Sequence, residues 1–267
     1  MSALENIVVA LPDFRAGEVW LAGSGPGDPG LLTLHAVHAL QRADVIVFDA
    51  LVSDEVMALA RKGAEREFAG KRGGKPSAKQ GDITDRLIEL ARQNKRVLRL
   101  KGGDPFIFGR GGEEALGLAK AGVSFRIVPG LTAGLAGLAY AAIPATTRGT
   151  NRAIVLATGH AAVSGEAALD WAGLAQTGLP IVLYMGMMHL GEIAREMLEA
   201  GASPQTPVAI VSEATTVRQR VLITTLQRAK ADADEQGFGA PAIVAIGSIV
   251  DLQASLAPFA LTLRGSN

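Results

Sequence analysis

The sequence of 267 residues contains no cysteine, only four histidines and no net charge. Without cysteine there can be no disulfide bond, no thiolate metal ligand and no cysteine nucleophile. Because 26 basic residues balance 26 acidic ones, the chain has no bulk charge to attract nucleic acid or an anionic membrane. No stretch approaches the 18 consecutive apolar residues of a membrane span. These absences favour a cytoplasmic protein with neither nucleic acid nor membrane as a partner.

Several familiar site motifs are missing as well. The histidines form no HExxH-like pattern, so we expect no metal site, and no GxSxG motif supplies a serine nucleophile. AGSGPGDPG (22–30) has Asp28 where the dinucleotide fingerprint needs its third glycine, which leaves a tight turn or a ligand-lining loop of another kind. GKRGGKPS (70–77) lacks the first glycine of a Walker loop, which leaves a solvated basic loop or a basic rim for an acidic ligand.

The first half of the chain alternates apolar strand-like runs with amphipathic helical runs. This alternation predicts a parallel sheet covered by helices on both faces. The expected strands are 18–22, 44–48, 66–70, 96–100 and 124–128. The expected helices are 31–42, 53–63 (with Ser53 as N-cap and Gly63 as stop), 82–94 and 111–121.

The second half predicts a mixed sheet, because some of its strands are joined by short turns too brief for a parallel crossover. The expected strands are 153–157, 180–185, 206–211, 219–225 and 241–247, with a helix over 188–201. Pro144 and Gly149 interrupt the chain after the small-residue helix TAGLAGLAYAA. We therefore expect two α/β domains with an active site in the cleft between them. The expected segments are a flexible leader (1–15), an N-terminal domain (16–143), a linker (144–152) and a C-terminal domain (153–267).

The stretch KGGDPFIFGRGGEE (101–114) combines features that a simple connection does not need. Gly102 and Gly103 would let a ligand approach main-chain N–H groups at the carboxyl end of a parallel strand, where open α/β sheets place their ligands. Arg110 and Glu113 would lie together as the next helix begins. The alternative is that the two phenylalanines merely fill the core.

A larger set of strings stands in order between about Gly17 and Asp251: AGSGPGDPGLLTL, ADVIVFDALVS, GKRGG, RLKGGDPFIFGRGGEE, VPGLTAG and YMGM. In these motifs the chain resembles the tetrapyrrole methylases, and within them the enzymes that methylate uroporphyrinogen III. The resemblance implies a homodimer that uses S-adenosylmethionine and no metal. It also implies methylation of uroporphyrinogen III at C2 and then C7, which gives precorrin-2 for sirohaem, cobalamin or haem d1.

The same resemblance implies a form without the additional N-terminal dehydrogenase/ferrochelatase domain of bifunctional relatives. The alternative function is a related methyltransferase of the same superfamily that acts on a later precorrin, on diphthine or on ribosomal RNA. The absence of net charge argues against the alternative in which the substrate is ribosomal RNA.

The resemblance also assigns roles to individual residues. It implies cofactor contacts at Pro26, Gly102, Gly103, Asp104, Ile107, Thr132, Ala133, Met185, Ala214 and Ala242. It implies an acid/base pair at Asp49 and Lys71, with Arg110 in the same catalytic set, and substrate contacts at Arg110, Glu113 and Arg148. Arginine stays protonated, so Arg110 is better suited to bind substrate carboxylates through two parallel hydrogen bonds than to remove a proton. Lys75 stands where many relatives have histidine and is given no role.

Overall fold

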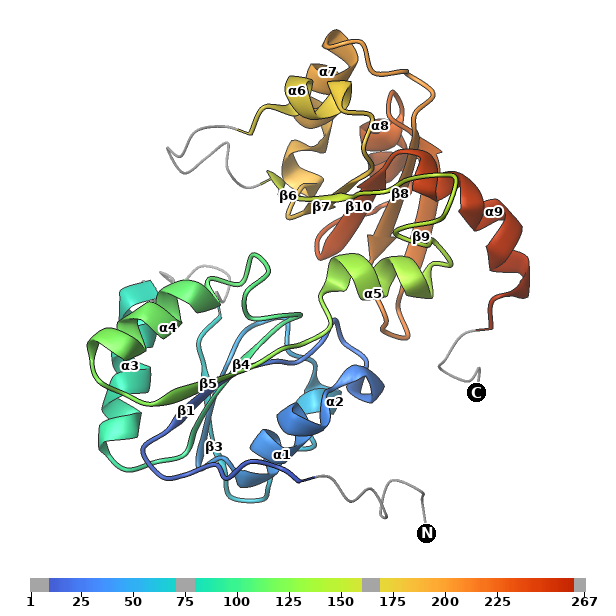
Figure 1. Ribbon diagram of the computed structural model, residues 1–267. Coiled ribbons are helices and arrows are strands. Elements are labelled where there is room, and N and C mark those ends of the chain that lie inside the picture. The colour runs from blue at the N-terminus through green and yellow to red at the C-terminus, as the bar shows by residue number, and fades with distance from the viewer. Residues whose placement is uncertain (1–9, 71–79, 160–168, 262–267) are drawn as a thin grey trace. The chain divides into compact units, whose positions relative to one another are not determined.

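The computed structural model describes residues 10–70, 80–159 and 169–261. The chain divides into two compact units, Met1–Leu131 and Thr132–Asn267, each built on a five-stranded sheet (Figure 1). The first sheet is parallel throughout and the second is mixed, as the sequence predicted. No helix within the described ranges is long and apolar enough to cross a membrane.

The sheet of the first unit has the strand order β3-β2-β4-β1-β5. Its strands are β1 (Val19–Gly23), β2 (Val45–Phe48), β3 (Glu65–Phe68), β4 (Val97–Lys101) and β5 (Phe125–Val128). Its helices are α1 (Leu34–Arg42), α2 (Asp54–Met57), α3 (Gln80–Arg92) and α4 (Gly111–Lys120). All five strands lie within two residues of their predicted positions.

Helices cover both faces of this sheet. Trp20 and Ala22 of β1 belong to a core cluster with α1 and α2, whereas Val19 and Leu21 belong to a second cluster with α3 and α4. The same division is visible in Figure 1, where the two helix pairs lie on opposite sides of the strands. Burial on both faces explains why the strands read as continuous apolar runs.

The last residues of the predicted leader (1–15) make contacts with the first unit. Phe14 is buried and stacks on Trp20 with ring centroids 4.6 Å apart. The Nε2 atom of His38 in α1 donates to the Pro12 carbonyl over 3.1 Å. Aromatic burial and this hydrogen bond therefore hold the end of the segment on α1. Residues 1–9 lie outside the described ranges.

Helix α2 is shorter than the predicted 53–63. Ser53 is its N-cap, as predicted, and its hydroxyl accepts from the Val56 N–H. The helix ends at Met57, however, because Arg61 makes hydrogen bonds to residues outside the helix. The Arg61 N–H donates to the Leu40 carbonyl, and its guanidinium donates to Ala43 O and to Asp44. These tertiary contacts compete with continuation of the helix toward Gly63.

The sheet of the second unit has the order β6-β7-β10-β8-β9. Strand β6 is parallel to β7, and β10 is antiparallel to both β7 and β8. The strands are β6 (Val155–Thr158), β7 (Ile181–Tyr184), β8 (Pro207–Ser212), β9 (Arg220–Thr225) and β10 (Ala242–Ile246). The helices are α5 (Ala133–Tyr140), α6 (Trp171–Gln176), α7 (Leu190–Glu199), α8 (Ala229–Glu235) and α9 (Gln253–Leu256).

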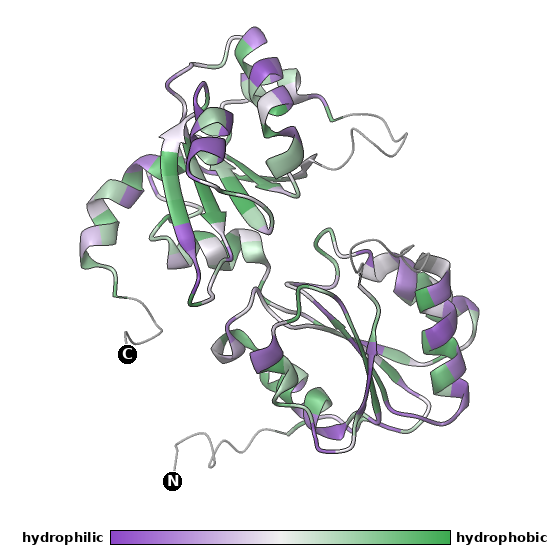
Figure 2. Cartoon of the chain, turned by 180° about the vertical axis from the view of Figure 1, so that it is seen from behind, coloured by the Kyte–Doolittle hydropathy of each residue, from purple (hydrophilic) through white to green (hydrophobic). Residues whose placement is uncertain are grey.

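The core of the second unit lies mainly between this sheet and three helices. Residues of α6, α7 and α8 form one apolar cluster with alternate residues of β7, β8 and β10. Figure 2 shows the hydrophobic colour on these strands and hydrophilic colour on the outward parts of the helices. Helix α5 contacts β7 and β10 and therefore falls in the second unit, whereas the predicted boundary placed it in the first.

Asp44 is held by arginines at the amino-terminal edge of the first sheet. Its carboxylate accepts from the Arg96 guanidinium over 2.8 and 3.0 Å, from the Arg96 N–H over 2.9 Å and from Arg61 over 2.7 Å. The hydrogen bond from the Arg96 side chain, the largest cause, lowers the pKa of Asp44 to about 2. The ordinary pKa of an aspartate is about 3.9, so the folded protein binds the proton of Asp44 more weakly than the unfolded chain.

We therefore predict that Asp44 contributes stability above about pH 4 and loses it as the pH falls through about 2. The contribution is about 1–2 kcal/mol, because the arginines are about one third exposed and solvent screens the pair. Asp44→Asn should accordingly lower the free energy of unfolding near neutral pH and much less near pH 2. Urea unfolding at both pH values measures this difference; an equal loss at both would contradict the prediction.

Candidate active site

The predicted site residues of the first unit meet at the carboxyl edge of its sheet. Pro26 follows β1, Asp49 follows β2 and Gly102 follows β4. Main-chain hydrogen bonds join these segments: Ser24 N donates to Lys101 O over 2.8 Å, and Asp49 N donates to Leu100 O over 3.2 Å. The edge is the one at which open α/β sheets bind ligands. Lys71, the predicted partner of Asp49, and Lys75 lie outside the described residues.

Glycines allow the turns after β1, β4 and β5 to touch through their main chains. Gly25 and Gly103 exchange two hydrogen bonds, of 3.2 and 2.8 Å. A Cβ atom at Gly130 would lie 2.2 Å from the Gly103 carbonyl oxygen, and one at Gly23 would lie 2.4 Å from it. Only glycine permits this approach. The N–H of Gly103 is thus engaged within the protein, contrary to the expectation that it points toward a ligand.

The Asp104 carboxylate fixes the loop that follows. Its Oδ1 atom accepts from Phe106 N over 2.8 Å, and its Oδ2 atom accepts from Gly130 N over 3.0 Å. The loop carries Ile107 between two phenylalanines, Phe106 and Phe108, that are 52% and 39% exposed. The phenylalanines therefore do not fill the core, which excludes the alternative interpretation of this stretch.

Arg110 and Glu113 form an ion pair at the start of α4, as the sequence predicted. Arg110 Nε and Nη2 donate to the two oxygens of Glu113 over 2.8 and 2.7 Å. The hydrogen bond from Arg110 lowers the pKa of Glu113. Both side chains are more than half exposed, and Arg110 itself has left-handed backbone angles, with φ at +58°. The guanidinium is therefore accessible at the sheet edge, with Glu113 bound to it.

Four charged side chains, Asp49, Arg99, Lys101 and Glu114, form what we call the buried ion network. The Arg99 guanidinium contacts Asp49 Oδ1 at 2.5 Å and Glu114 Oε1 at 3.0 Å. The Lys101 ammonium contacts Glu114 Oε1 at 3.1 Å and Asp49 Oδ2 at 3.5 Å. Arg99, Lys101 and Glu114 are at most 3% exposed, whereas Asp49 is 29% exposed. Asp49 is thus the member of the network that faces the surface.

Sequence reasoning missed Arg99, Lys101 and Glu114 as parts of the site. A signal was present, because Arg99 and Lys101 are two charges at alternate positions of an otherwise apolar strand, VLRLK. Alternate residues of a strand share a face, and a strand buried on both faces has no place for an unpaired charge. The pattern therefore indicates buried acidic partners, although it does not identify them.

In the second unit, the predicted cofactor contacts gather at one edge of the sheet. Met185 follows β7 and Ala214 follows β8, while Ala242 begins the antiparallel strand β10 and pairs with Ser212 at the end of β8. Thr132 and Ala133 begin α5, whose Gly137 lies so close to Ala214 that a Cβ atom there would be 2.9 Å from the alanine methyl group. The structure thus brings all five together within this unit.

Tyr184 joins two of these segments and was also missed by sequence reasoning. Its hydroxyl lies 2.8 Å from Thr132 Oγ1 and accepts from Gly134 N over 3.1 Å. A Cβ atom at Gly134 would be 2.2 Å from this hydroxyl. Tyr184 therefore fixes the start of α5 beside Met185, which is half exposed and has a φ of +51°. Nothing in the sequence distinguishes Tyr184 from the other residues of its apolar strand.

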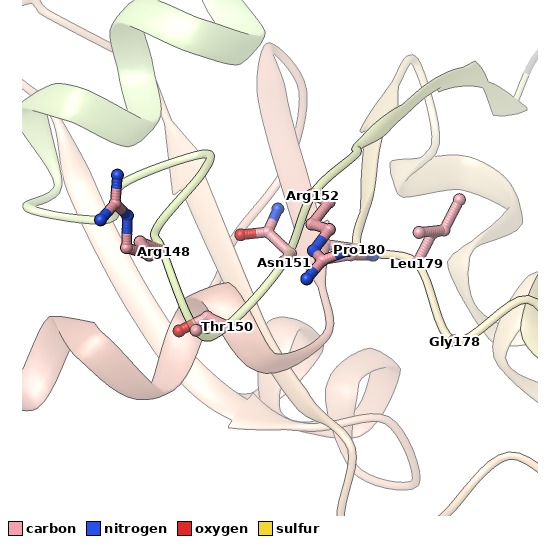
Figure 3. A pocket seen from close by; sticks show the side chains of 8 residues that line it. Arg148, Thr150, Asn151, Arg152, Gly178, Leu179 and Pro180 are labelled. Atoms are coloured by element: carbon pink, nitrogen blue, oxygen red, sulfur yellow. The ribbon is translucent and has the colours of Figure 1, made fainter.

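Arg148 is not brought to this edge. It lines a hollow of about 400 Å³ together with the residues just before β7, which is the opposite end of that strand from Met185. The lining residues are Arg148, Gly149, Thr150, Asn151, Arg152, Gly178, Leu179 and Pro180. In Figure 3 the Arg148 side chain points away from Arg152, so the two guanidinium groups do not converge on one point.

The side chains at these edges do not include a set of metal ligands. Within residues 10–70, 80–159 and 169–261, no group of three histidine, cysteine, aspartate or glutamate side chains could hold a metal ion. The edges instead present main-chain turns, aliphatic groups and ion pairs. Such an arrangement can bind an organic ligand and orient a charged one.

Comparison with known proteins gives one consistent result. A uroporphyrinogen-III C-methyltransferase from Sinorhizobium is 56% identical over 255 residues, covering 95% of this chain and 91% of that protein. Siroheme synthase 1 of Pectobacterium atrosepticum is 46% identical over 94% of this chain, which spans only 52% of that longer protein.

Among solved structures, the uroporphyrin-III C-methyltransferase of Thermus thermophilus, in complex with S-adenosylhomocysteine, aligns with a TM-score of 0.74 and 35% identity. The alignment covers 88% of this chain and 99% of the Thermus chain. The family model of tetrapyrrole (corrin/porphyrin) methylases matches residues 18–230. These residues run from β1 into α8 and include the edge of the first sheet, the buried ion network and all of the second edge except Ala242, and the chain therefore belongs to the tetrapyrrole methylases.

Proposed function

We propose that this chain transfers methyl groups from S-adenosylmethionine to C2 and then C7 of uroporphyrinogen III, giving precorrin-2. The chain is a methyltransferase, and S-adenosylmethionine is its methyl donor. The observation that carries the choice of acceptor is the 56% identity to the Sinorhizobium enzyme, which extends over 95% of the chain. Precorrin-2 would then serve sirohaem, cobalamin or haem d1 synthesis.

The residues at the two sheet edges fit a methyl donor of this kind. When bound, S-adenosylmethionine supplies a methyl group that is already activated on sulfur, so no metal ligand or nucleophilic side chain is required. Gly102 allows the main chain after β4 to lie close to Leu51, because a Cβ atom at this position would be only 2.8 Å from Leu51 Cβ. Ala214 lies between Glu213 and Thr215, both with positive φ, which makes a sharp turn after β8. We assign the predicted cofactor contacts to these turns.

The chain's own residues would bind and orient the acceptor. Uroporphyrinogen III carries several carboxylates, and a guanidinium binds a carboxylate through two parallel hydrogen bonds. Arg110 is exposed and already holds one carboxylate, that of Glu113, in this geometry. A substrate carboxylate can take the place of Glu113 on the same guanidinium. We assign Arg110 and Glu113 to this exchange.

Asp49 is the group that we assign to proton handling. Methyl transfer breaks the sulfur–methyl bond of the donor and forms a carbon–carbon bond at a substituted pyrrole carbon. The tetrapyrrole is then cationic, and a proton must leave it from another position to restore neutrality. Asp49 is a partly exposed carboxylate at the sheet edge, and its two oxygens contact Arg99 and Lys101. Lys71 completes the proposed acid/base pair.

The function is tested by incubating the purified protein with S-adenosylmethionine and uroporphyrinogen III without oxygen. Mass spectrometry should find a product that has gained two methyl groups, preceded by one that has gained a single group. Heat-denatured protein is the control. Failure to methylate uroporphyrinogen III would overturn the proposal, and methylation of only a later precorrin would move the chain to another branch of the family.

We also propose that the chain acts as a homodimer in the cytoplasm. Large apolar side chains stay exposed on the single chain, among them Leu116 at 71%, Val217 at 73% and Met188 at 84%. Exposed apolar residues of this size are common at subunit interfaces. Light scattering should give twice the chain mass of 27.6 kDa, and the mass of one chain would contradict the dimer.

A further inference from the structure

We propose that Lys101 and Arg99 are positioning residues that fix the Asp49 carboxylate for methyl transfer, with Glu114 holding them in place. The proposal rests on the proposed function and adds to it three residues of the buried ion network. The structural basis is that one carboxylate at the sheet edge is held by two buried cations, one on each oxygen.

The two contacts define the orientation of Asp49. Arg99 Nη2 lies 2.5 Å from Oδ1, and Lys101 Nζ lies 3.5 Å from Oδ2. Rotation of the carboxylate about its own axis would therefore break both contacts. Proton transfer and electrostatic stabilisation depend on such placement, because a misaligned group loses most of its effect.

The cations themselves cannot follow a moving Asp49. The Arg99 guanidinium also donates to Glu114 Oε1 and to the carbonyl oxygens of Val47 and Leu100, over 3.0, 3.3 and 3.4 Å. The Lys101 ammonium is shared with Glu114 Oε1 over 3.1 Å. Glu114 is on α4 and has no exposed surface, so it acts as the fixed point of the network.

Charge balance explains why Asp49 stays at this position. Arg99, Lys101 and Glu114 together carry one positive charge in the interior, and the anionic Asp49 cancels it. A net charge in a low-dielectric interior is unfavourable, so the three buried residues favour the arrangement in which Asp49 remains beside them. Asp49, the most exposed residue of the network, is thus held in position by the three buried residues.

The network is also continuous with the loop that carries predicted cofactor contacts. Lys101 is the last residue of β4, and Gly102 and Gly103 follow it directly. The Lys101 carbonyl accepts from Ser24 N, which fixes the strand end beside the turn after β1. The same short segment therefore orients Asp49 by its side chain and the glycine loop by its main chain.

The test measures the methylation rate of Lys101→Met with and without Asp49→Asn, using methyl-labelled S-adenosylmethionine and uroporphyrinogen III. Lys101→Met keeps the length of the side chain and removes the cation. Loss of a charge-assisted contact predicts a fall in kcat of about 10- to 150-fold, with cofactor affinity close to that of the original chain. In the Asp49→Asn background, Lys101→Met should change kcat by less than about twofold, because a positioning residue acts only through the group it positions.

Two further variants serve as controls. Lys95→Met removes an ion-paired lysine from the other end of β4, where Lys95 contacts Glu65 at 3.3 Å, and should leave kcat unchanged. Lys101→Met combined with Glu114→Gln removes one positive and one negative charge, so the interior stays balanced even if the single variant fails to fold. This double variant should lose at least as much kcat as Lys101→Met alone, because Glu114 also holds Arg99.

The outcomes separate the inference from the function on which it rests. Original kcat in a folded Lys101→Met or in the balanced double variant would overturn the inference. An equal loss of kcat with and without Asp49 would also overturn it, because Lys101 would then act independently of Asp49. If the unmodified chain does not methylate uroporphyrinogen III at all, the proposed function is wrong and the positioning role for that reaction falls with it.

Discussion

Asp49→Asn is expected to lower kcat for methyl transfer by about 100- to 10,000-fold, the usual contribution of a general acid or base. The amide cannot accept a proton, and it no longer cancels the buried positive charge of its neighbours. Affinity for S-adenosylmethionine should change little, because the assigned cofactor contacts are main-chain turns. Single-turnover methylation, together with calorimetry of cofactor binding, measures the two effects separately.

The matched control for this change is Asp44→Asn. Asp44 lies at the other end of β2 and is also held by two basic residues. Its loss should reduce stability without reducing kcat in the folded protein. If Asp49→Asn were as active as Asp44→Asn, Asp49 would have no part in proton handling.

Arg110→Ala is expected to reduce methyl transfer by about 10- to 150-fold and to leave cofactor affinity nearly intact. The variant should stay folded, because an ion pair exposed to this degree contributes little to stability. Arg110→Lys should recover little activity, since an ammonium group cannot reproduce the two parallel hydrogen bonds seen with Glu113. Single-turnover methylation and cofactor calorimetry of both variants are the measurements.

Arg195→Ala provides the matched control, because Arg195 is also an exposed arginine paired with a glutamate on its own helix. It should affect neither methylation nor cofactor binding. Unchanged turnover in Arg110→Ala would remove Arg110 from the substrate side. A parallel loss of cofactor affinity would instead assign it to the cofactor.

The sequence predicted the two sheets well because their strands are strong local signals. In the first unit, runs such as Val45–Phe48 are apolar at every position, as expected for strands covered on both faces. The end of α2 was not predictable, because it depends on contacts of Arg61 with α1 and Asp44, which are distant in sequence. The short helices α6 and α8 were missed, since six or seven residues carry too little periodicity.

The parts of the candidate site that could be predicted are mainly those formed by local main-chain turns and neighbouring residues. Glycine-rich turns at strand ends and the Arg110–Glu113 pair are visible as local patterns. Side chains that meet across the fold are not: Glu114 follows Glu113 directly, yet one is buried and the other exposed because of where α4 packs. Tyr184 shows the same limit, because its role depends on a hydroxyl contact with Thr132, which lies far away in the sequence.

The ion pairs around β2 and β4 also bear on how these two strands find their register. In a half-exposed sheet, alternating apolar and polar residues specify the register, but strands buried on both faces carry little of that information. Here Asp44 meets Arg96 before the strands, and Asp49 meets Arg99 and Lys101 toward their other end. A slip of one residue would separate acid from base at both ends and leave buried charge unpaired. This costs far more free energy than placing one apolar side chain where another had been. Charges at the strand ends thus specify an alignment that the apolar residues between them leave open.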